Sequence, residues 1–248
     1  MKYLTNEPKE RKKKNRHSKT FLLKIFLMLA MIEASINSEI HLVIQGSGQQ
    51  KLLSDYYSGV EPSEVFVNGV KDVSCSKTCN LKGDRNNITL KFDTQIESCS
   101  SMFRYLDNIT EIDLSNFKAS KVTDMGFMFN GCSKLEKIEF GNINTPSLEN
   151  MYGMFQSCSK LKSIDLSKFD TSKVTRMQYM FGGCSSLIYL NLKSFKLKNT
   201  VDKDYAFNGI SSYVKYCIEN SETKKFLFHY LQYNILYLKS FQEMHNLY

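Results

Sequence analysis

Apolar side chains recur every 26 residues through the middle of the chain. The dipeptide Met-Phe returns at this interval, and columns of isoleucine, leucine and phenylalanine keep the same phase; the dipeptides are at residues 102–103, 128–129, 154–155 and 180–181. Each unit follows the pattern apolar-x-x-apolar-x-apolar-x-x-apolar, as in residues 161–169. A unit of this length is too small to bury its own apolar side, so it must stack on its neighbours. The spacing therefore predicts a repeat array.

Two segments of each unit have different periodicities. Ile164 and Leu166 are separated by one polar residue, which predicts a short parallel strand with its apolar side chains inward. Val122, Met125 and Met128 are spaced by three, which predicts a helical or 3₁₀ return turn that packs on the core. The predicted fold is an α/β-type solenoid, a leucine-rich-repeat stack of 26-residue units, over residues 96–210.

The segment before residue 39 has the order of a secretory signal peptide. Within residues 1–38, a basic stretch precedes an apolar run, and small polar residues follow. We expect cleavage near residue 38, with an uncleaved signal-anchor as the alternative. This segment carries nine of the chain's basic residues and three of its acidic ones, leaving 24 basic and 22 acidic residues elsewhere. A nucleic-acid partner is therefore not expected, because such a surface needs clustered basic residues on the folded body.

The array is flanked by two predicted caps. Residues 39–95 predict a β-rich N-terminal cap, with a hairpin at the Asn68-Gly69 dipeptide. Residues 211–248 predict a C-terminal cap, because the open end of a repeat stack must be covered. This cap is expected to contain a last strand over residues 213–218 and a helix from about residue 222 to 241, N-capped by Ser221.

The cysteines indicate one disulfide loop and one column of free thiols. Seven cysteines leave at least one without a partner in the chain. Cys75 and Cys79 stand close enough for a small disulfide loop, with free thiols or half a metal site as alternatives; no second Cys/His pair is nearby to complete four zinc ligands. Cys132, Cys158 and Cys184 share the 26-residue register, which predicts buried free thiols because stacked identical side chains point the same way.

Glycosylation motifs support export of the chain. Asn87-Ile88-Thr89 and Asn108-Ile109-Thr110 both fit the N-glycosylation acceptor pattern. Each triplet alone is weak evidence, because such triplets also occur by chance.

The polar positions of the predicted strands form the candidate binding surface, the concave face. Like charges on adjacent strands destabilise a sheet, so solvent, a nearby lysine or a basic partner must offset them. A solvated face without a ligand is the alternative. The candidate residues are the central column Asp113, Glu139, Asp165 and Asn191, flanked by Lys137 and Tyr189.

Catalytic motifs are missing from the sequence. It contains no Gly-rich phosphate loop, His-Glu-x-x-His motif or nucleophile elbow. We therefore expect no enzymatic activity, no cofactor and no metal site.

Residues 131–135 and 164–177 resemble BspA-type leucine-rich repeats, which occur in surface proteins of mycoplasmas, other bacteria and unicellular eukaryotes. The resemblance covers residues 96–210. It implies a secreted or surface-attached protein used in adhesion or partner recognition, without catalytic residues. The ligand, a protein or a glycan, is left open. A structural surface-coat component and a type II membrane-anchored protein are the alternatives, and membrane contact is expected only through an uncleaved leader.

Overall fold

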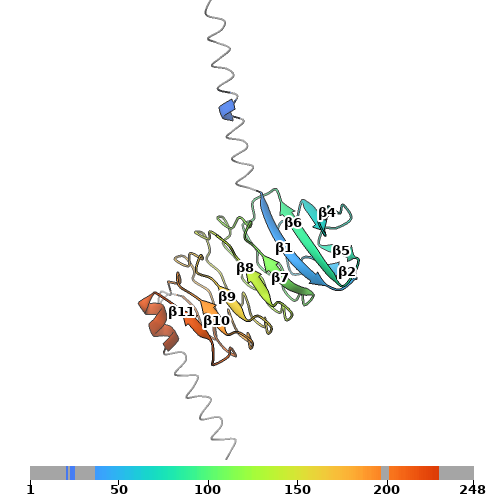
Figure 1. Cartoon of the computed structure of the whole chain (residues 1–248). Helices are drawn as coiled ribbons and strands as arrows, with labels where there is room; N and C mark the ends of the chain where they lie inside the picture. Colours follow the sequence, from blue (N-terminus) through green and yellow to red (C-terminus); the bar gives the residue numbers. More distant parts are fainter. Residues whose placement is uncertain (1–20, 22, 26–36, 197–200, 229–248) are drawn as a thin grey trace, which may run out of the picture.

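The structure, a computed structural model, describes residues 21, 23–25, 37–196 and 201–228. Within these ranges the chain forms a row of strands that runs from the N-terminal segment, through the repeat units, to a short helix at the far end (Figure 1). The strands are β1 Ser38–Gln45, β2 Gly48–Lys51, β3 Glu64–Val67, β4 Val70–Lys71, β5 Thr78–Leu81, β6 Arg85–Phe92, β7 Ile109–Asp113, β8 Lys137–Glu139, β9 Ser163–Asp165, β10 Tyr189–Asn191 and β11 Lys215–Cys217.

The N-terminal strands and the first repeat units share one sheet. Its order is β4-β3-β6-β1-β7-β8, and the remaining strands form a β11-β10-β9 sheet and a β2-β5 pair. Strand β1 pairs antiparallel with both β6 and β7, whereas β7 and β8 pair in parallel. Buried Ile40, Leu42 and Ile44 alternate with outward residues along β1, so the strand covers the exposed end of the repeat core. The predicted N-terminal cap is thus continuous with the array.

The predicted α/β-type solenoid, a leucine-rich-repeat stack with helical or 3₁₀ return turns, is wrong. The described residues are mostly β, and helix among them is confined to residues 21, 23–25 and 221–228. The return segments are successive turns, and the strands of the units belong to two separate sheets. Isolated parallel bridges join the return segments of neighbouring units, at Ser98, Asp124, Asn150, Arg176 and Asp202.

Hydrogen bonding explains why an apolar spacing of three does not give a helix here. Alternate N–H groups of a return segment donate to the next unit: Met125 donates to the Asn150 carbonyl at 2.9 Å, and Phe127 donates to the Tyr152 carbonyl at 2.7 Å. Phe129 donates to the Met154 carbonyl at 2.9 Å, and Met128, between Phe127 and Phe129, closes a turn within the unit by donating to the Met125 carbonyl at 3.2 Å. An α-helix uses each N–H for its own i−4 carbonyl, so the two arrangements exclude each other.

Left-handed backbone recurs at two positions of every return segment. Phe127, Tyr179 and Tyr205 have φ values of 57°, 56° and 57°, although bulky residues avoid this region at a cost of about 1–2 kcal/mol each. Four positions further on, the second column includes Ser157 at 63° and Gly183 at 74°. The backbone bonds between units hold these residues in place, and residues in such sparsely populated conformations persist only where their surroundings impose them.

Stacked phenylalanines form the centre of the core. The rings of Phe103, Phe129, Phe155, Phe181 and Phe207 follow one another along the array, with centroid distances of 5.9, 5.4, 5.8 and 5.3 Å. All five rings are buried, at 2 % exposure or less. Contacts between these rings, one in each unit, therefore align each unit with the next.

The sheet breaks between β8 and β9. Among the described residues no strand pairing joins them, whereas β7–β8 and β9–β10 are paired in register. Phe140 follows β8 where the other units have leucine, and its ring packs edge-on against Phe169 at 4.9 Å and Phe155 at 6.3 Å. We attribute the break to this larger side chain. The return segments of the same two units remain bonded, as from Met151 to the Arg176 carbonyl at 2.8 Å.

The boundaries of the folded part differ slightly from those predicted at the N-terminal side. Ser38 is the first residue of β1, is 2 % exposed, and accepts the Lys118 N–H through Oγ at 2.9 Å. Ser38 is therefore part of the folded region. Most of the predicted signal peptide, residues 1–20, 22 and 26–36, lies outside the described residues.

At the C-terminal side, β11 falls within the predicted last strand, and a helix begins at residue 221. Its N-cap is Asn220 and not Ser221, because the Asn220 Oδ1 accepts the Thr223 N–H at 2.9 Å. The helix is described to residue 228, and its predicted continuation to residue 241 lies outside the described residues.

A pair of substitutions tests the left-handed column. Gly183→Ala should lower the free energy of unfolding by about 1 kcal/mol, because alanine avoids this backbone region. The added Cβ itself meets atoms no closer than 3.6 Å, so crowding contributes little. Ser157→Gly, at the equivalent position, should leave the free energy of unfolding within about 0.5 kcal/mol of the wild-type value. Relief of backbone strain in the folded state offsets the greater conformational entropy that glycine gives the unfolded chain. Urea unfolding monitored by circular dichroism measures both, and equal effects of the two changes would contradict the assignment.

The free thiols should differ sharply in reactivity. Cys132, Cys158 and Cys184 are fully buried, and each thiol donates to a phenylalanine carbonyl of the preceding unit at 3.0–3.1 Å. Burial raises the pKa of Cys132 and of Cys184 to about 12, so both stay protonated near neutral pH. Cys217 is only partly buried.

At pH 7.5 a maleimide should therefore label the native protein once, at Cys217, and label all five free cysteines after unfolding in urea. Mass spectrometry of the labelled peptides gives the order of reaction. Early labelling of the three stacked thiols would show that the repeat core opens to solvent.

Candidate binding face

The structure places the predicted central column on the outward face of the sheets. Asp113 of β7 is in register with Glu139 of β8, and Asp165 of β9 is in register with Asn191 of β10. The residues before them are buried, so Asp113, Glu139 and Asp165 point away from the core, whereas Asn191 is itself buried, at 9 % exposure. Because β8 and β9 are unpaired among the described residues, the column consists of two paired halves.

Two of the acidic side chains cap their own turns. Asp113 Oδ1 accepts the Ser115 N–H and Asp165 Oδ1 accepts the Ser167 N–H, both at 2.8 Å. Asn191 does the same for Lys193 at 3.2 Å. An Asx turn needs one side-chain oxygen, which both aspartate and asparagine provide.

The electrostatics of the column are partly balanced within the chain. Burial raises the pKa of Asp165, but hydrogen bonds from Ser167 and Asn191 outweigh it and leave the pKa below its usual value. Glu139 forms an ion pair with Lys137 at 3.5 Å, as the sequence suggested. For Asp113 and Asp165 the structure gives no ion pair among the described residues, so neither carboxylate is within salt-bridge distance of a lysine or arginine there.

Strands β1 and β6 extend this face beyond the repeats. His41 of β1 is in register with Asp113, and its Nδ1 lies 3.0 Å from the hydroxyl of Thr89 on β6. Sequence reasoning missed His41 as a site residue. The alternation along β1 indicated which side chains point outward, but the pairing of β1 with β7 joins residues about 70 positions apart.

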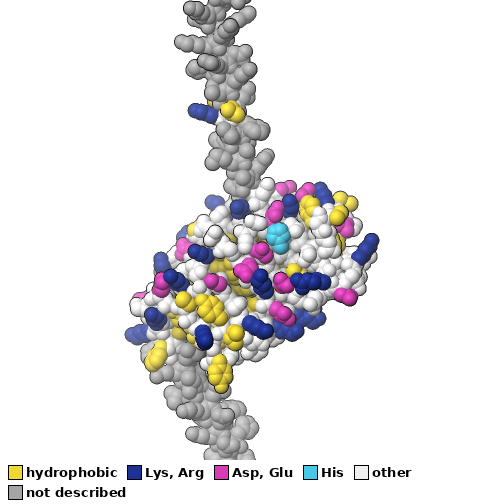
Figure 2. Space-filling model, in the orientation of Figure 1, with side chains coloured by type: hydrophobic (Ala, Val, Ile, Leu, Met, Phe, Trp, Pro, Cys, Tyr) yellow, Lys and Arg dark blue, Asp and Glu magenta, His cyan; other side chains and the backbone are white. Residues whose placement is uncertain are grey.

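A hollow of about 270 Å³ lies across these strands. Charged groups of both signs surround it, and Arg85 pairs with Glu111 at 2.8 Å at one side. Figure 2 shows acidic and basic side chains intermingled over this face, with hydrophobic groups gathered toward β10 and β11. Tyr189, 40 % exposed, belongs to β10. The outward residues that line the hollow are His41, Val43, Asn87, Thr89, Glu111, Asp113, Lys137 and Glu139.

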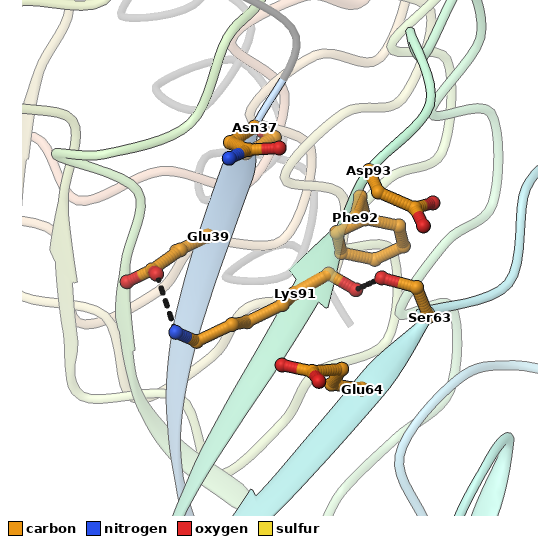
Figure 3. Close-up of a pocket in the computed structure, with 8 residues that line it drawn as sticks. Asn37, Glu39, Ser63, Glu64, Lys91, Phe92 and Asp93 are labelled. Atoms are coloured by element: carbon orange, nitrogen blue, oxygen red, sulfur yellow. Dashed lines mark hydrogen bonds and ion pairs between the residues drawn. The ribbon is translucent and has the colours of Figure 1, made fainter. Parts of the chain in front are cut away.

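A second hollow, of about 400 Å³, lies where β1, β3 and β6 meet (Figure 3). Lys91 extends across it to Glu39 at 3.1 Å, and Ser63 donates its hydroxyl hydrogen to the Lys91 carbonyl at 3.1 Å. Glu64 is hydrogen-bonded by Lys71 at 2.6 Å, which lowers the pKa of Glu64. In this hollow the charges of Glu39, Lys91 and Glu64 are therefore already paired.

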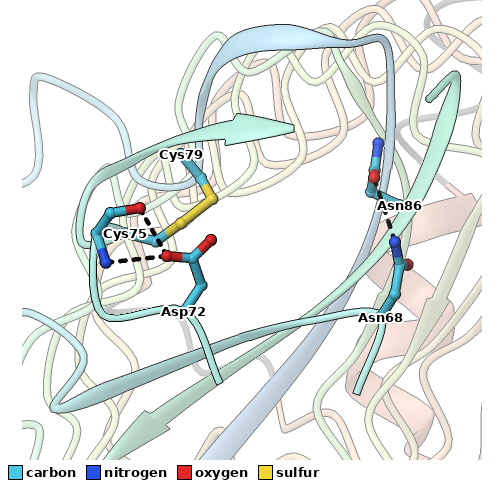
Figure 4. Close-up of a disulfide and its surroundings, with 6 residues drawn as sticks. Asn68, Asp72, Cys75, Cys79 and Asn86 are labelled. Atoms are coloured by element: carbon cyan, nitrogen blue, oxygen red, sulfur yellow. Dashed lines mark hydrogen bonds between the residues drawn. A yellow bond between two sulfur atoms is a disulfide. The ribbon is translucent and has the colours of Figure 1, made fainter. Parts of the chain in front are cut away.

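Cys75 and Cys79 form a disulfide (Figure 4). Asp72 is the third member of the one group of potential metal ligands found among the described residues. Its carboxylate accepts the Ser74 N–H at 2.9 Å and hydroxyl at 2.6 Å. Both sulfurs are used in the covalent bond, so this loop offers no thiolate pair to a metal.

An aromatic strip on the return edge also escaped sequence reasoning. The Arg104 guanidinium carbon lies 4.6–4.9 Å from the ring centroids of Tyr56, Tyr105 and Phe127. Tyr179 and Tyr205 stack at 5.1 Å further along. The arginine is enclosed by rings and its Nε also donates to Asn130, so it is already engaged.

Comparison with known proteins gives one match. No curated protein and no solved structure matches the chain. Residues 97–220, half of the chain, match the model of one protein family, and they contain strands β7 to β11 with their return segments. The chain therefore belongs to the family described as "Mycoplasma protein of unknown function, DUF285".

Proposed function

We propose that the protein is an exported interaction module, secreted or held at the cell surface, that binds an extended basic segment of a partner protein. The binding face is the outward side of β1, β7, β8 and β9. The observation that carries this proposal is the pair of carboxylates, Asp113 and Asp165, for which the structure gives no ion pair among the described residues, although the other acids nearby have one.

The spacing of the acidic column suits an extended chain. Paired strands lie about 4.8 Å apart, so a peptide crossing β7 and β8 meets one column position per strand. Asp165 belongs to the neighbouring sheet, beyond the break between β8 and β9. Asp113 uses one oxygen in a turn, and its second oxygen is left for a charge-assisted bond from lysine or arginine. Asp165 also accepts a hydrogen bond from Asn191, so its contribution is mainly its negative charge. The hollow beside Asp113 adds Glu111 and the ring of His41 as further contacts.

Export is supported by several features of the chain. Residues 1–38 have the order of a signal peptide, and two N-glycosylation triplets follow. The Cys75–Cys79 disulfide suits an oxidising compartment. Within the described ranges, no helix has the length and apolarity that a membrane crossing requires. The resemblance of residues 96–210 to BspA-type surface proteins points the same way.

Removing the column's charge should weaken binding of a basic peptide. The triple variant Asp113→Asn, Glu139→Gln, Asp165→Asn keeps an oxygen for each turn, as Asn191 does naturally. A fluorescent ten-residue peptide of alternating lysine and serine should bind at least about tenfold more weakly, since one hydrogen bond to a charged group is worth about 1.5–3 kcal/mol. Fluorescence anisotropy on unglycosylated protein at about 0.1 M salt measures the dissociation constant.

A matched control separates local charge from net charge. The variant Glu97→Gln, Glu149→Gln, Asp204→Asn removes the same number of charges from exposed positions in the return segments. It should bind the peptide within about twofold of the wild type, because exposed charges beyond the Debye length of about 10 Å are screened. Equal weakening by both variants, or no weakening by either, would refute this binding face.

A further inference from the structure

The two glycosylation triplets occupy different environments in the fold. Asn87 is an exposed residue of β6, and its backbone forms the bonds to the β3–β4 turn: its N–H donates to the Asn68 side chain at 2.9 Å, and its carbonyl accepts the Asn68 N–H at 2.8 Å. The Asn87 side chain points outward with Thr89, on the same face. Its amide nitrogen is therefore open to a substituent that leaves the strand pairing intact.

Asn108 uses its amide within the fold. Its Nδ2 donates to Gln50 Oε1 at 3.0 Å and to the Lys51 carbonyl at 3.3 Å. The Asn108 Oδ1 is buried, and the hydroxyl of Thr110 donates to the Val43 carbonyl at 3.3 Å. An attached sugar replaces one of the two amide hydrogens, so at least one of these bonds to β2 would be lost.

Asn87 also lies at the proposed binding hollow. It lines the hollow together with Val43, Thr89 and Glu111, and with His41. The first sugar on this residue would stand directly at the rim of the hollow. Covalent attachment would give that sugar a high effective concentration there, without any affinity of its own.

We infer that Asn87 is the glycosylated residue of this chain, and that its glycan covers the hollow and closes the binding face. The inference rests on the proposed function. Transfer joins the Asn87 Nδ2 to the anomeric carbon of an oligosaccharide carried on a lipid pyrophosphate. The bond from that carbon to the pyrophosphate oxygen breaks, the lipid pyrophosphate leaves with the electron pair, and the amide releases one proton.

The site of attachment is tested on the complete chain, with its own leader, secreted from cultured eukaryotic cells that perform N-glycosylation. Peptide N-glycosidase converts a formerly glycosylated asparagine to aspartate, and mass spectrometry of the peptides then identifies the site. We expect conversion at Asn87 and an unmodified Asn108. Secreted protein without a glycan at Asn87 would overturn the inference and leave export intact.

The covering role is tested with the lysine–serine peptide as probe. The glycosylated wild type should bind it at least tenfold more weakly than Asn87→Gln. A control moves the glycan: Asn87→Gln combined with Lys173→Asn places a new acceptor triplet, completed by Thr175, at an exposed loop position. That protein should carry a glycan and bind like Asn87→Gln.

Three other outcomes have distinct meanings. Equal binding by the wild type and Asn87→Gln would overturn the covering role. Weak binding by the protein with the moved glycan would assign the effect to any glycan, and would overturn it too. If neither the wild type nor Asn87→Gln binds the peptide, the proposed binding face itself is wrong, whereas the peptide analysis still decides the site of attachment.

Discussion

The backbone hydrogen bonds between successive return segments are the constraint on which the rest of this structure depends. Alternate N–H groups of one unit donate to carbonyls of the next, from Cys99 in the first unit to Gly183 in the fourth. These bonds fix the 26-residue register and hold tyrosine and phenylalanine in left-handed conformations. They also keep the phenylalanine rings in one column. The strands on the other side of each unit are only three to five residues long and add comparatively few bonds.

Much of this fold could be predicted from local sequence patterns. The alternation along residues 40–44, the Asn68-Gly69 turn and the strand positions within the units each depend on neighbours a few residues away. The return segments could not be predicted in the same way. Apolar side chains spaced by three suit a helix and a series of turns equally well, and nothing local indicates that Phe127 would adopt a positive φ. The hydrogen bonds to the following unit decide between the two structures.

The candidate binding face likewise could be predicted from the sequence only in part. The repeat register was enough to align Asp113 with Glu139 and Asp165 with Asn191. It could not show that three of these side chains also cap turns, nor that β1 would bring His41 beside Asp113. Half of the hollow comes from strands outside the repeats. For a surface formed by repeat strands and by strands outside the repeats, the sequence therefore predicts only the residues contributed by the repeat strands.

The break between β8 and β9 has a mechanical consequence. In Figure 1 the first strands and the final helix lie at opposite ends of the row, so a tension applied between these two ends would pass along the stack. At Phe140 the strands are unpaired within the described residues, so the backbone hydrogen bonds that resist this tension are those between the return segments. Hydrogen bonds on one side only would break one after another and not all at once. The array would therefore extend between β8 and β9 before the units on either side of this break unfold.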